Sequence, residues 1–587
     1  MKTKKSMSKL ILILTVAALA AAGCTSGNKN GTPTAAPSGS GGSMVGENAE
    51  KPLVKYKYLI RGITKPTSST EDEIGQLIKE KFNVEFEFIP YNESNYEKAQ
   101  LMLAANDWGD IDIVTTGLDD ITKKYIQAGV FLKLDDYKDL LPNFFDYEKD
   151  VIPYWRTFDE NNGDLYVWQA GPDQQQLTSE PLDIVTRVDV LEGLGWPQLD
   201  TTDDYIEFLR NAMKKFPESL GKKSIGMINF WGEPIGPLLA TYLPRHSGYQ
   251  HVYKTTGLVD VEAKKFVSLP GHPYTKETFK FWNTLYREGL MDKEAWTDKF
   301  PEFQKKWESG VALTANFAKW MVPDKNAKME QLGHPEMQYI VTPIRLSIAK
   351  NEGKNVRYEL TNSLRPDETT GILKTAKNPE RLLEVINFMA SKEMTIRLGW
   401  GVEGRDYVVK DGVRVPTEEY VQIVKSGDPD KVLQKRFGIG YATMFPIRYI
   451  AVGDDGQHNM ASSDSRYLMA VATETQKKAY QAYGWDTMLD AWHNNPNFKL
   501  ESFDITPYIV ASNIAPSQSE AKIEEKIIQL MNKQIPLIIT AKNDAEFENH
   551  YNETVSKADE LGLQKIIDKY NEQLQNFSSR IEELSNR

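Results

Sequence analysis

Two stretches of the chain alternate apolar and polar side chains, which is the pattern of half-buried strands. In VKYKYLIRG the apolar residues stand at 54, 56, 58 and 60, and in NVEFEFIP they stand at 84, 86 and 88. Between them, a capping-box pattern of Thr70 and Glu73 precedes apolar residues at helical spacing. A second predicted helix over 94–105 leads into DIDIVTTG. The order βαβαβ predicts an α/β fold with a mostly parallel sheet.

Later segments show the same two patterns, the alternation of strands and the spacing of amphipathic helices. SIGMINFW, GVALTANFAKW and MQYIVTPI predict strands of a second sheet, and the apolar stripe over 203–216 predicts an amphipathic helix. Asn378 as N-cap and Pro379 at the first helical position begin another helix. The last third is mostly helical in pattern, and no fixed-period repeat is visible. Ligands bind beyond the carboxyl ends of strands in such sheets, which points to the turns after Ile60 and Val114.

The first residues have the pattern of a secretory signal. Four lysines precede an apolar run of thirteen residues, Leu10 to Ala22, which is shorter than the roughly twenty residues of a membrane-spanning helix. The chain's single cysteine, Cys24, follows small residues, and the stretch resembles the lipobox at which bacterial prolipoproteins are lipidated and cut, with Ala21 where leucine is usual. We therefore expect a signal peptide over 1–23 and a lipidated Cys24 that anchors the protein at the extracellular face of the cell membrane. Ordinary cleavage that leaves a free thiol is the alternative.

The residues after Cys24 are rich in Gly, Ser, Thr, Pro and Asn, which predicts a flexible linker over 24–52 and ordered structure from about Leu53. The net charge of −12 disfavours binding to nucleic acid. With one cysteine and seven scattered histidines, we expect no internal disulfide, no metal and no cofactor.

No catalytic motif stands out, and we predict no catalytic residues. Acidic pairs such as Asp110 with Asp112, or Asp454 with Asp455, carry little information among 82 acidic residues. A secreted polysaccharide-processing enzyme and a structural surface protein remain as weaker hypotheses. Turnover of an oligosaccharide would support the first, and the second would predict repeats.

Six segments resemble one family in order along nearly the whole mature chain: NDWGDIDIVTTG, AGVFLKLDDY, TRVDVLEGLGWPQLDTTDDYIEFL, LYREGLMDKEAW, NPERLLEVINFMASKEMTIRLGWGVEGRDYV and ADELGLQKIIDKYNEQLQNF. The chain resembles the extracellular solute-binding proteins of family 1, in particular the LplA-like lipoproteins that bind oligosaccharides for ABC importers. The resemblance implies a two-lobed periplasmic-binding-protein-like fold of type II, with a hinge between the lobes and a helical C-terminal part.

The resemblance also sets expectations for lobes and partners. The N-terminal lobe is expected over 53–180 and 342–395, and the C-terminal lobe over 181–341 and 396–587. The expected ligand is an oligosaccharide or another small polar solute such as a peptide, and the expected partners are the permease subunits of an ABC transporter. We expect a monomer.

Several relatives hold a calcium ion in an Asp/Asn-rich loop after the helix that corresponds to 203–216. This chain has KKFPESLGKKSIGM there, which offers one carboxylate where calcium needs six or more oxygens. DENNGD at 159–164 is a weak substitute, because such clusters are usually turns. We therefore predict no metal.

A sugar site needs aromatic faces and planar polar groups. Trp282 and Trp307 lie in helical stripes and are expected in the core. The cluster GWGVEGRDY, in which three glycines disfavour a helix, matches the family's GxEGxxY segment, and packing of a structural turn is its alternative role. The predicted ligand-binding residues are Trp400, Glu403, Arg405, Tyr407, Trp231, Trp320, Gln169, Thr115, Thr116 and Arg187. For Trp231 and Trp320 packing within a lobe is the alternative, and for Arg187 it is a structural salt bridge.

Overall fold

The computed structural model describes residues 51–60, 63, 65–91, 96–117, 120–170, 173–178, 182–233, 236–243, 247–252, 255–318, 321–354, 356–364, 369–428, 430–438, 440–441, 444–448, 452–493, 499–514 and 518–587. The chain divides after Glu47 into two units. The predicted signal peptide, Cys24 and nearly all of the predicted linker lie outside the described residues. Within the described ranges, no helix is both long and apolar enough to cross a membrane.

A six-stranded sheet contains the first predicted strands. Its order is β2 (Thr67–Ser68), β3 (Val84–Pro90), β1 (Val54–Ile60), β4 (Ile113–Thr116), β17 (Thr369–Ile372) and β5 (Val167–Gln169). Strand β1 runs parallel to β3 and β4, as the βαβαβ pattern predicted, whereas β17 is antiparallel to both of its neighbours. The carboxyl ends of β1, β3 and β4 therefore lie at one edge of this sheet.

A four-stranded sheet contains the strands predicted from SIGMINFW, GVALTANFAKW and MQYIVTPI. Its order is β10 (Ile225–Ile228), β14 (Ala312–Ala318), β7 (Leu182–Arg187) and β15 (Tyr339–Val341). Strands β10 and β14 run parallel, and β7 runs antiparallel to β14 and β15. The carboxyl ends of β10 and β14 therefore lie at the opposite edge from the carboxyl end of β7.

Four smaller sheets complete the described strands. One sheet joins β20 (Lys499–Asp504), β16 (Val356–Asn362) and β6 (Asp173–Thr178), and its strands β6 and β16 lie in chain segments that connect the two larger sheets. The others contain β11 (Tyr249–His251), β12 (Gly257–Asp260) and β13 (Lys265–Ser268); β18 (Tyr407–Lys410) and β19 (Val413–Pro416); and β8 (Glu218–Ser219) and β9 (Lys222–Lys223).

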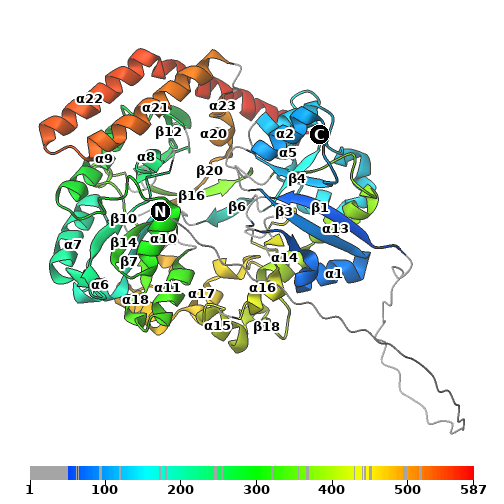
Figure 1. Ribbon diagram of the computed structural model, residues 1–587, viewed down its shortest axis with the longest axis horizontal. Coiled ribbons are helices and arrows are strands. Elements are labelled where there is room, and N and C mark those ends of the chain that lie inside the picture. Colours follow the sequence, from blue (N-terminus) through cyan, green and yellow to red (C-terminus); the bar gives the residue numbers. More distant parts are fainter. Residues whose placement is uncertain are drawn as a thin grey trace, which may run out of the picture. The chain divides into compact units, whose positions relative to one another are not determined.

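Helices cover both larger sheets (Figure 1). Those up to residue 390 are α1 (Glu73–Phe82), α2 (Glu97–Ala105), α3 (Asp120–Gln127), α4 (Pro142–Tyr147), α5 (Ile152–Arg156), α6 (Val188–Gly193), α7 (Thr202–Lys215), α8 (Gly236–Leu239), α9 (Pro273–Arg287), α10 (Phe300–Glu308), α11 (Val322–Gln331), α12 (Ser347–Asn351) and α13 (Pro379–Met389). The later ones are α14 (Lys392–Trp400), α15 (Glu418–Lys425), α16 (Val432–Phe437), α17 (Ser465–Val471), α18 (Glu474–Tyr483), α19 (Asp490–His493), α20 (Thr506–Ala511), α21 (Ser519–Ile539), α22 (Asp544–Leu561) and α23 (Leu563–Ser585). The predicted helical C-terminal part is confirmed.

Two of the predicted helix starts differ in detail. Helix α1 begins at Glu73 with Asp72 as N-cap, whose carboxylate accepts the Gly75 N–H at 2.8 Å, because Thr70 belongs to a preceding 3₁₀ turn. The predicted capping box of Thr70 and Glu73 is therefore wrong. Asn378 does stand at the N-cap of α13, but its side chain makes no capping bond.

Two main hydrophobic cores correspond to the two larger sheets. The first core packs around the six-stranded sheet, and the second core packs around one face of the four-stranded sheet and the helices α7, α9 and α21 to α23. A smaller core covers the other face of the four-stranded sheet and includes Trp307. Trp282 lies in the second core, so both tryptophans predicted as core residues are buried, with 1% and 0% of their surface exposed.

Two segments pack across the predicted lobe boundaries. Residues Ile344 to Ala349 lie in the second core, although the N-terminal lobe was expected to resume at 342. Tyr441, Met444, Phe445 and Ile447 lie in the first core, although they were expected in the C-terminal lobe. Helix α23 contributes to both cores, with Tyr570 in the second and Phe577 in the first.

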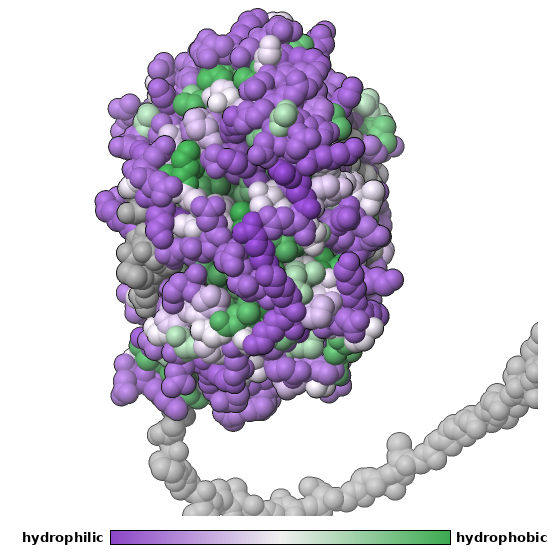
Figure 2. Space-filling model, turned by 90° about the vertical axis from the view of Figure 1, so that its left-hand side faces the viewer, coloured by the Kyte–Doolittle hydropathy of each residue, from purple (hydrophilic) through white to green (hydrophobic). Residues whose placement is uncertain are grey.

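The face that carries α7 and α9 is largely hydrophilic, with small separate apolar patches (Figure 2).

Candidate functional site

Hydroxyl and amide groups gather where β4 and β5 end and β17 begins. Thr115 and Thr116 end β4, and they pair in register with Thr370 and Thr369. The Thr115 and Thr370 hydroxyl oxygens lie 3.2 Å apart, and the Gln169 amide donates to the Thr369 hydroxyl at 2.8 Å. The structure thus brings the predicted residues Thr115, Thr116 and Gln169 together at one edge of the six-stranded sheet.

Every one of these groups is buried in this conformation, with at most 2% of its surface exposed. Tyr58 joins them, because its hydroxyl lies 3.0 Å from the Thr370 hydroxyl and donates to the Met444 carbonyl at 2.9 Å. The Thr116 and Thr122 hydroxyls lie 2.6 Å apart. Sequence reasoning missed Thr369 and Thr370, since only strand pairing over more than 250 residues places them beside β4. The cluster can exchange hydrogen bonds in both directions, because hydroxyls donate and accept.

The matching edge of the four-stranded sheet carries two asparagines. Asn229 directly follows β10, Asn316 lies on β14, and the Asn316 amide donates to Asn229 Oδ1 at 3.0 Å. Asn229 is 1% exposed, whereas Asn316 is half-buried. Neither residue was predicted, because a single asparagine after a strand is not a distinctive sequence signal.

Trp231 lies two residues beyond Asn229, but it belongs to the second core. It is 2% exposed, and its ring centroid lies 4.7 Å from that of Trp296 and 5.1 Å from that of Trp282. The structure therefore favours the packing role that was the alternative for Trp231. Trp320, the other candidate of this kind, lies outside the described residues.

Arg187 lies at the carboxyl end of β7, which is the opposite edge of the same sheet. Its guanidinium pairs with Asp189 and donates to the Ser219 hydroxyl and the Gly310 carbonyl, both at 2.7 Å. Since these bonds use its donors and 3% of its surface is exposed, the structure favours the salt-bridge role that was the alternative for Arg187.

The cluster that contains Trp400 also packs inward. Trp400 is the last residue of α14, is 2% exposed and forms a small core with Tyr407, Tyr420 and Tyr467. Its indole N–H donates to the His458 carbonyl at 2.9 Å. Of the three glycines only Gly399 lies in the helix, where a Cβ would clash with the Asn459 carbonyl oxygen. Gly401, with a φ of 88°, ends the helix as its C-cap, so the residues after Trp400 are not part of it. Because the ring is enclosed by other aromatic side chains of its own core, the structure favours the packing role that was the alternative for Trp400.

The charged residues beside Trp400 hold this segment against α1. Arg405 donates to both Glu73 oxygens, at 2.8 and 2.9 Å, and to Asp406 at 2.9 Å. Although burial opposes the charge, the hydrogen bonds to Asp406 and Glu73 hold the pKa of Arg405 above its ordinary value. Tyr407 is 8% exposed, and Glu403 is exposed. Arg405 thus forms structural ion pairs and Tyr407 packs in the small core. The structure favours the structural turn that was the alternative role of the segment GWGVEGRDY.

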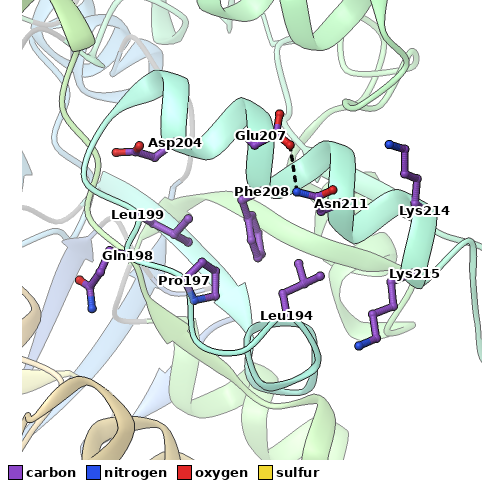
Figure 3. Close-up of a pocket in the computed structure, with 10 residues that line it drawn as sticks. All are labelled: Leu194, Pro197, Gln198, Leu199, Asp204, Glu207, Phe208, Asn211, Lys214 and Lys215. Carbon is purple, nitrogen blue, oxygen red and sulfur yellow. Dashed lines mark hydrogen bonds between the residues drawn. The ribbon is translucent and has the colours of Figure 1, made fainter.

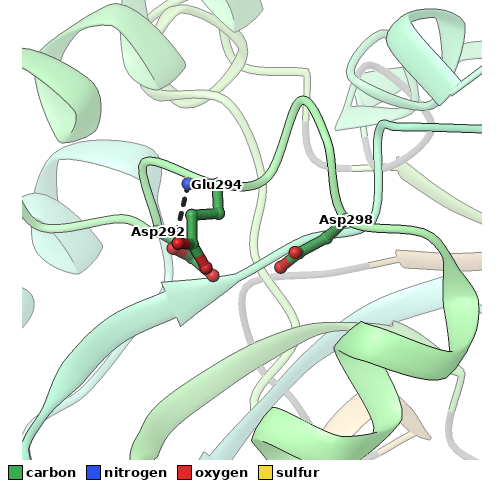
Figure 4. A group of neighbouring side chains, drawn as sticks. All are labelled: Asp292, Glu294 and Asp298. Carbon is green, nitrogen blue, oxygen red and sulfur yellow. Dashed lines mark hydrogen bonds between the residues drawn. The ribbon is translucent and has the colours of Figure 1, made fainter. Parts of the chain in front are cut away.

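One group of side chains within the described residues has the composition of a metal site: Asp292, Glu294 and Asp298 (Figure 4). The Lys306 ammonium already lies among them, at 2.7, 2.6 and 2.5 Å from their respective oxygens. Burial lowers the pKa of Lys306, but the three hydrogen bonds outweigh burial and hold it above its ordinary value. The Lys306 side chain therefore occupies the position that a metal cation would take. At 159–164, Asp159 accepts backbone N–H groups of Asn161 and Asp164, which is a turn.

A surface pocket of about 480 Å³ lies between the turn after α6 and the helix α7 (Figure 3). Leu194, Pro197, Leu199 and Phe208 form its apolar part, and charged or amide groups of α7 line the rest, with the Asn211 amide donating to Glu207 at 3.0 Å. It contains none of the predicted ligand-binding residues, so the sheet edges remain the candidate site.

Comparison with known proteins agrees with this architecture. No family model matches the chain. Lipoprotein LipO of Bacillus subtilis (strain 168) is 23% identical over 316 residues, a match that covers 50% of this chain and 56% of the lipoprotein. The chain thus spans little more than half the length of this relative.

Solved structures match over most of the chain. An extracellular solute-binding protein of Bifidobacterium longum subsp. infantis gives a TM-score of 0.61 at 15% identity, covering 89% of this chain and 98% of that one. FusA, an ABC-transporter substrate-binding protein of S. pneumoniae in complex with kestose, gives 0.59 at 16% identity, covering 90% and 100%. The alginate-binding protein AlgQ2, solved without calcium ion, gives 0.57 at 16% identity, covering 90% and 98%. The chain therefore has the two-lobed α/β fold of transporter solute-binding proteins, which confirms the predicted fold class.

Proposed function

We propose that this chain is the extracellular solute-binding component of an ABC importer and that it captures an oligosaccharide between its two lobes. The observation that carries the proposal is the pair of sheet edges, where the carboxyl ends of parallel strands bear hydroxyl and amide side chains. Such groups exchange hydrogen bonds with sugar hydroxyls, and ligands of open α/β sheets bind at these edges. The fold it shares with a kestose-bound protein supports the same ligand class.

On the N-terminal lobe, Thr115, Thr116 and Gln169 are the proposed ligand-binding residues, with Thr369 and Thr370 beside them. The lobes hinge at the sheet of β6, β16 and β20, and opening there gives a solute access to groups that are buried in this conformation. We place Ile344–Ala349 with the C-terminal lobe, because Ile344, Leu346 and Ala349 pack in the second core. We place Tyr441 and 444–447 with the N-terminal lobe, because Tyr441, Met444, Phe445 and Ile447 pack in the first core. Small-angle X-ray scattering tests the hinge, since a bound oligosaccharide should reduce the radius of gyration of an open form.

A thermal-shift screen of the purified mature protein tests the proposed ligand. A panel of kestose, maltotriose, cellotriose and mannotriose is compared with a matched panel of short peptides, because a solute that binds only the folded state raises the melting temperature. Stabilisation by an oligosaccharide without any change in its chromatogram supports the proposal. Stabilisation by peptides alone would contradict the oligosaccharide class, and hydrolysis products would indicate an enzyme instead.

The proposed location follows from Cys24, which lies outside the described residues. Lipidation there attaches the protein to the outer face of the cell membrane, where permease subunits of an importer are accessible. Cys24→Ser should release the protein from the membrane fraction and change the mass of its N-terminal peptide. Unchanged fractionation together with an unchanged mass would contradict lipidation.

A further inference from the structure

Asn229 occupies a position at the ligand edge of the second lobe that its packing alone does not explain. It directly follows β10, whose carboxyl end lies beside that of the parallel strand β14. This is the edge at which open α/β sheets bind ligands. Its side chain is almost completely buried, with 1% of its surface exposed.

The amide of Asn229 is used on one side only. Its Oδ1 accepts the hydrogen bond from Asn316, which fixes the orientation of the amide, while its Nδ2 has no hydrogen-bond partner among the described residues. Leaving a buried donor unpaired costs about 1 to 3 kcal/mol of folding stability. Such a donor therefore calls for a partner, and at a ligand edge a bound molecule can supply it.

A second unpaired donor belongs to a ring that packs against the segment after Asn229. The indole Nε1 of Trp296 is buried without a partner in the described part of the chain, and its ring packs on Trp231, two residues beyond Asn229. Asn316, which is half-buried, extends this polar set toward the surface. Donors without acceptors suit a ligand that is rich in oxygen acceptors.

We infer that Asn229 is a ligand-binding residue of the second lobe, whose Nδ2 donates to a hydroxyl or ring oxygen of the bound oligosaccharide. This inference rests on the proposed function and adds a residue to the same site. In the open conformation solvent reaches this edge, and in the closed complex the sugar oxygen supplies the missing acceptor.

The same strand offers a matched control. Ser224 directly precedes β10, is 2% exposed, and its hydroxyl also lacks a partner among the described residues. It lies at the amino end, however, away from the ligand edge. If replacing any buried unpaired polar group weakened binding, substitutions at both positions would lower the affinity for the ligand. A direct ligand contact predicts a loss of affinity only for the substitution at Asn229.

The experiment compares Asn229→Leu and Ser224→Ala with the wild type by isothermal titration, using the member of the oligosaccharide panel that most raises the wild-type melting temperature. We expect Asn229→Leu to weaken binding at least about tenfold, which corresponds to about 1.4 kcal/mol, while Ser224→Ala stays within about twofold. In urea unfolding, Ser224→Ala should keep at least the wild-type midpoint, because it removes an unpaired hydroxyl. Asn229→Leu should change the midpoint little, because loss of the bond from the half-buried Asn316 offsets removal of the unpaired donor.

Equal affinity of Asn229→Leu and wild type would overturn the inference. So would a parallel loss of affinity and stability, because that indicates a structural role. Asn229→Ser, which is smaller and still polar, replaces the leucine variant if that variant does not fold, and the same criteria apply. A wild type that binds no member of the panel overturns the proposed function itself, which is a separate outcome.

Discussion

Lys306 is expected to be essential for the stability of the second lobe, and Lys306→Ala tests this. The ammonium bonds three carboxylates, and two of them, Asp292 and Asp298, have side chains that are only 8% and 7% exposed. Removing one partner of a buried ion pair typically costs about 3 to 5 kcal/mol, because the remaining charge is left without compensation. Glu294 contributes less, since 69% of its side chain is exposed.

The loss should depend on pH in a defined direction. Burial already holds the pKa of Asp298 above its ordinary value, and losing Lys306, which lowers it, raises that pKa further, so the folded variant holds a proton that the unfolded chain releases. Stability of the variant therefore falls as pH rises, and its deficit relative to wild type is smaller at pH 5 than at pH 8.

Calcium should restore part of the loss, because three carboxylates without the ammonium suit a hard cation. At a hundredfold excess over its Kd, a ligand adds about 2.7 kcal/mol.

Urea unfolding followed by tryptophan fluorescence measures these effects at both pH values, with and without calcium. Lys305→Ala is the control, because Lys305 lies on the same helix and is exposed. We expect the control to change the free energy of unfolding by less than about 0.5 kcal/mol. If Lys306→Ala is no less stable than Lys305→Ala, the three short contacts do not stabilise the lobe and the reasoning fails.

Three further substitutions test burial elsewhere. Trp400→Ala should lower the free energy of unfolding by about 3 to 5 kcal/mol in urea titrations, and a loss below about 1 kcal/mol would contradict its place in a core. Burial raises the pKa of Glu524 on α21 to about 7, so wild-type stability should fall between pH 4.5 and 7, and Glu524→Gln should flatten that slope in unfolding midpoints across this range. Phe577→Ala should lower the free energy of unfolding by about 3 kcal/mol, because the ring of this α23 residue lies in the first core. Gln575→Ala, at an exposed position of the same helix, is the control, and equal urea midpoints of the two variants would contradict this packing.

The sequence predicted those elements whose own side chains determine them. β1 and β3 alternate strongly because one face packs into the first core, and α7 has a stripe because one face packs into the second. The short strand β17 was not predicted. It contains Thr369, Thr370 and Gly371, and its place in the sheet depends on pairing with strands that lie more than 190 residues earlier in the chain.

The candidate site was predictable only in part. Thr115, Thr116 and Gln169 were selected because each ends a predicted strand, and strand ends converge at sheet edges for a general topological reason. Of the candidates chosen for chemical type, Trp400 packs inward and Arg405 pairs with Glu73, because glycines beside an aromatic residue indicate a turn but not which side chains are covered. Orientation of that kind depends on contacts such as that between Trp400 and His458, which no local pattern contains.

Lys306 also has a consequence for the ligand edge. The loop that it holds runs alongside the end of β10: Asp292 N–H donates to the Met227 carbonyl, Trp231 N–H to the Ala295 carbonyl, and Gly232 N–H to the Asp298 carbonyl, at 2.8, 2.7 and 2.9 Å. Asn229 lies within the stretch that these bonds fix. The ion cluster around Lys306 thus fixes the position of Asn229, the residue proposed to contact the ligand. Because the cation of this cluster is a lysine side chain, the loop does not need a free metal ion to keep its conformation. Loss of Lys306 is therefore expected to weaken oligosaccharide binding as well as stability, and calcium should restore both together, since one loop carries both effects.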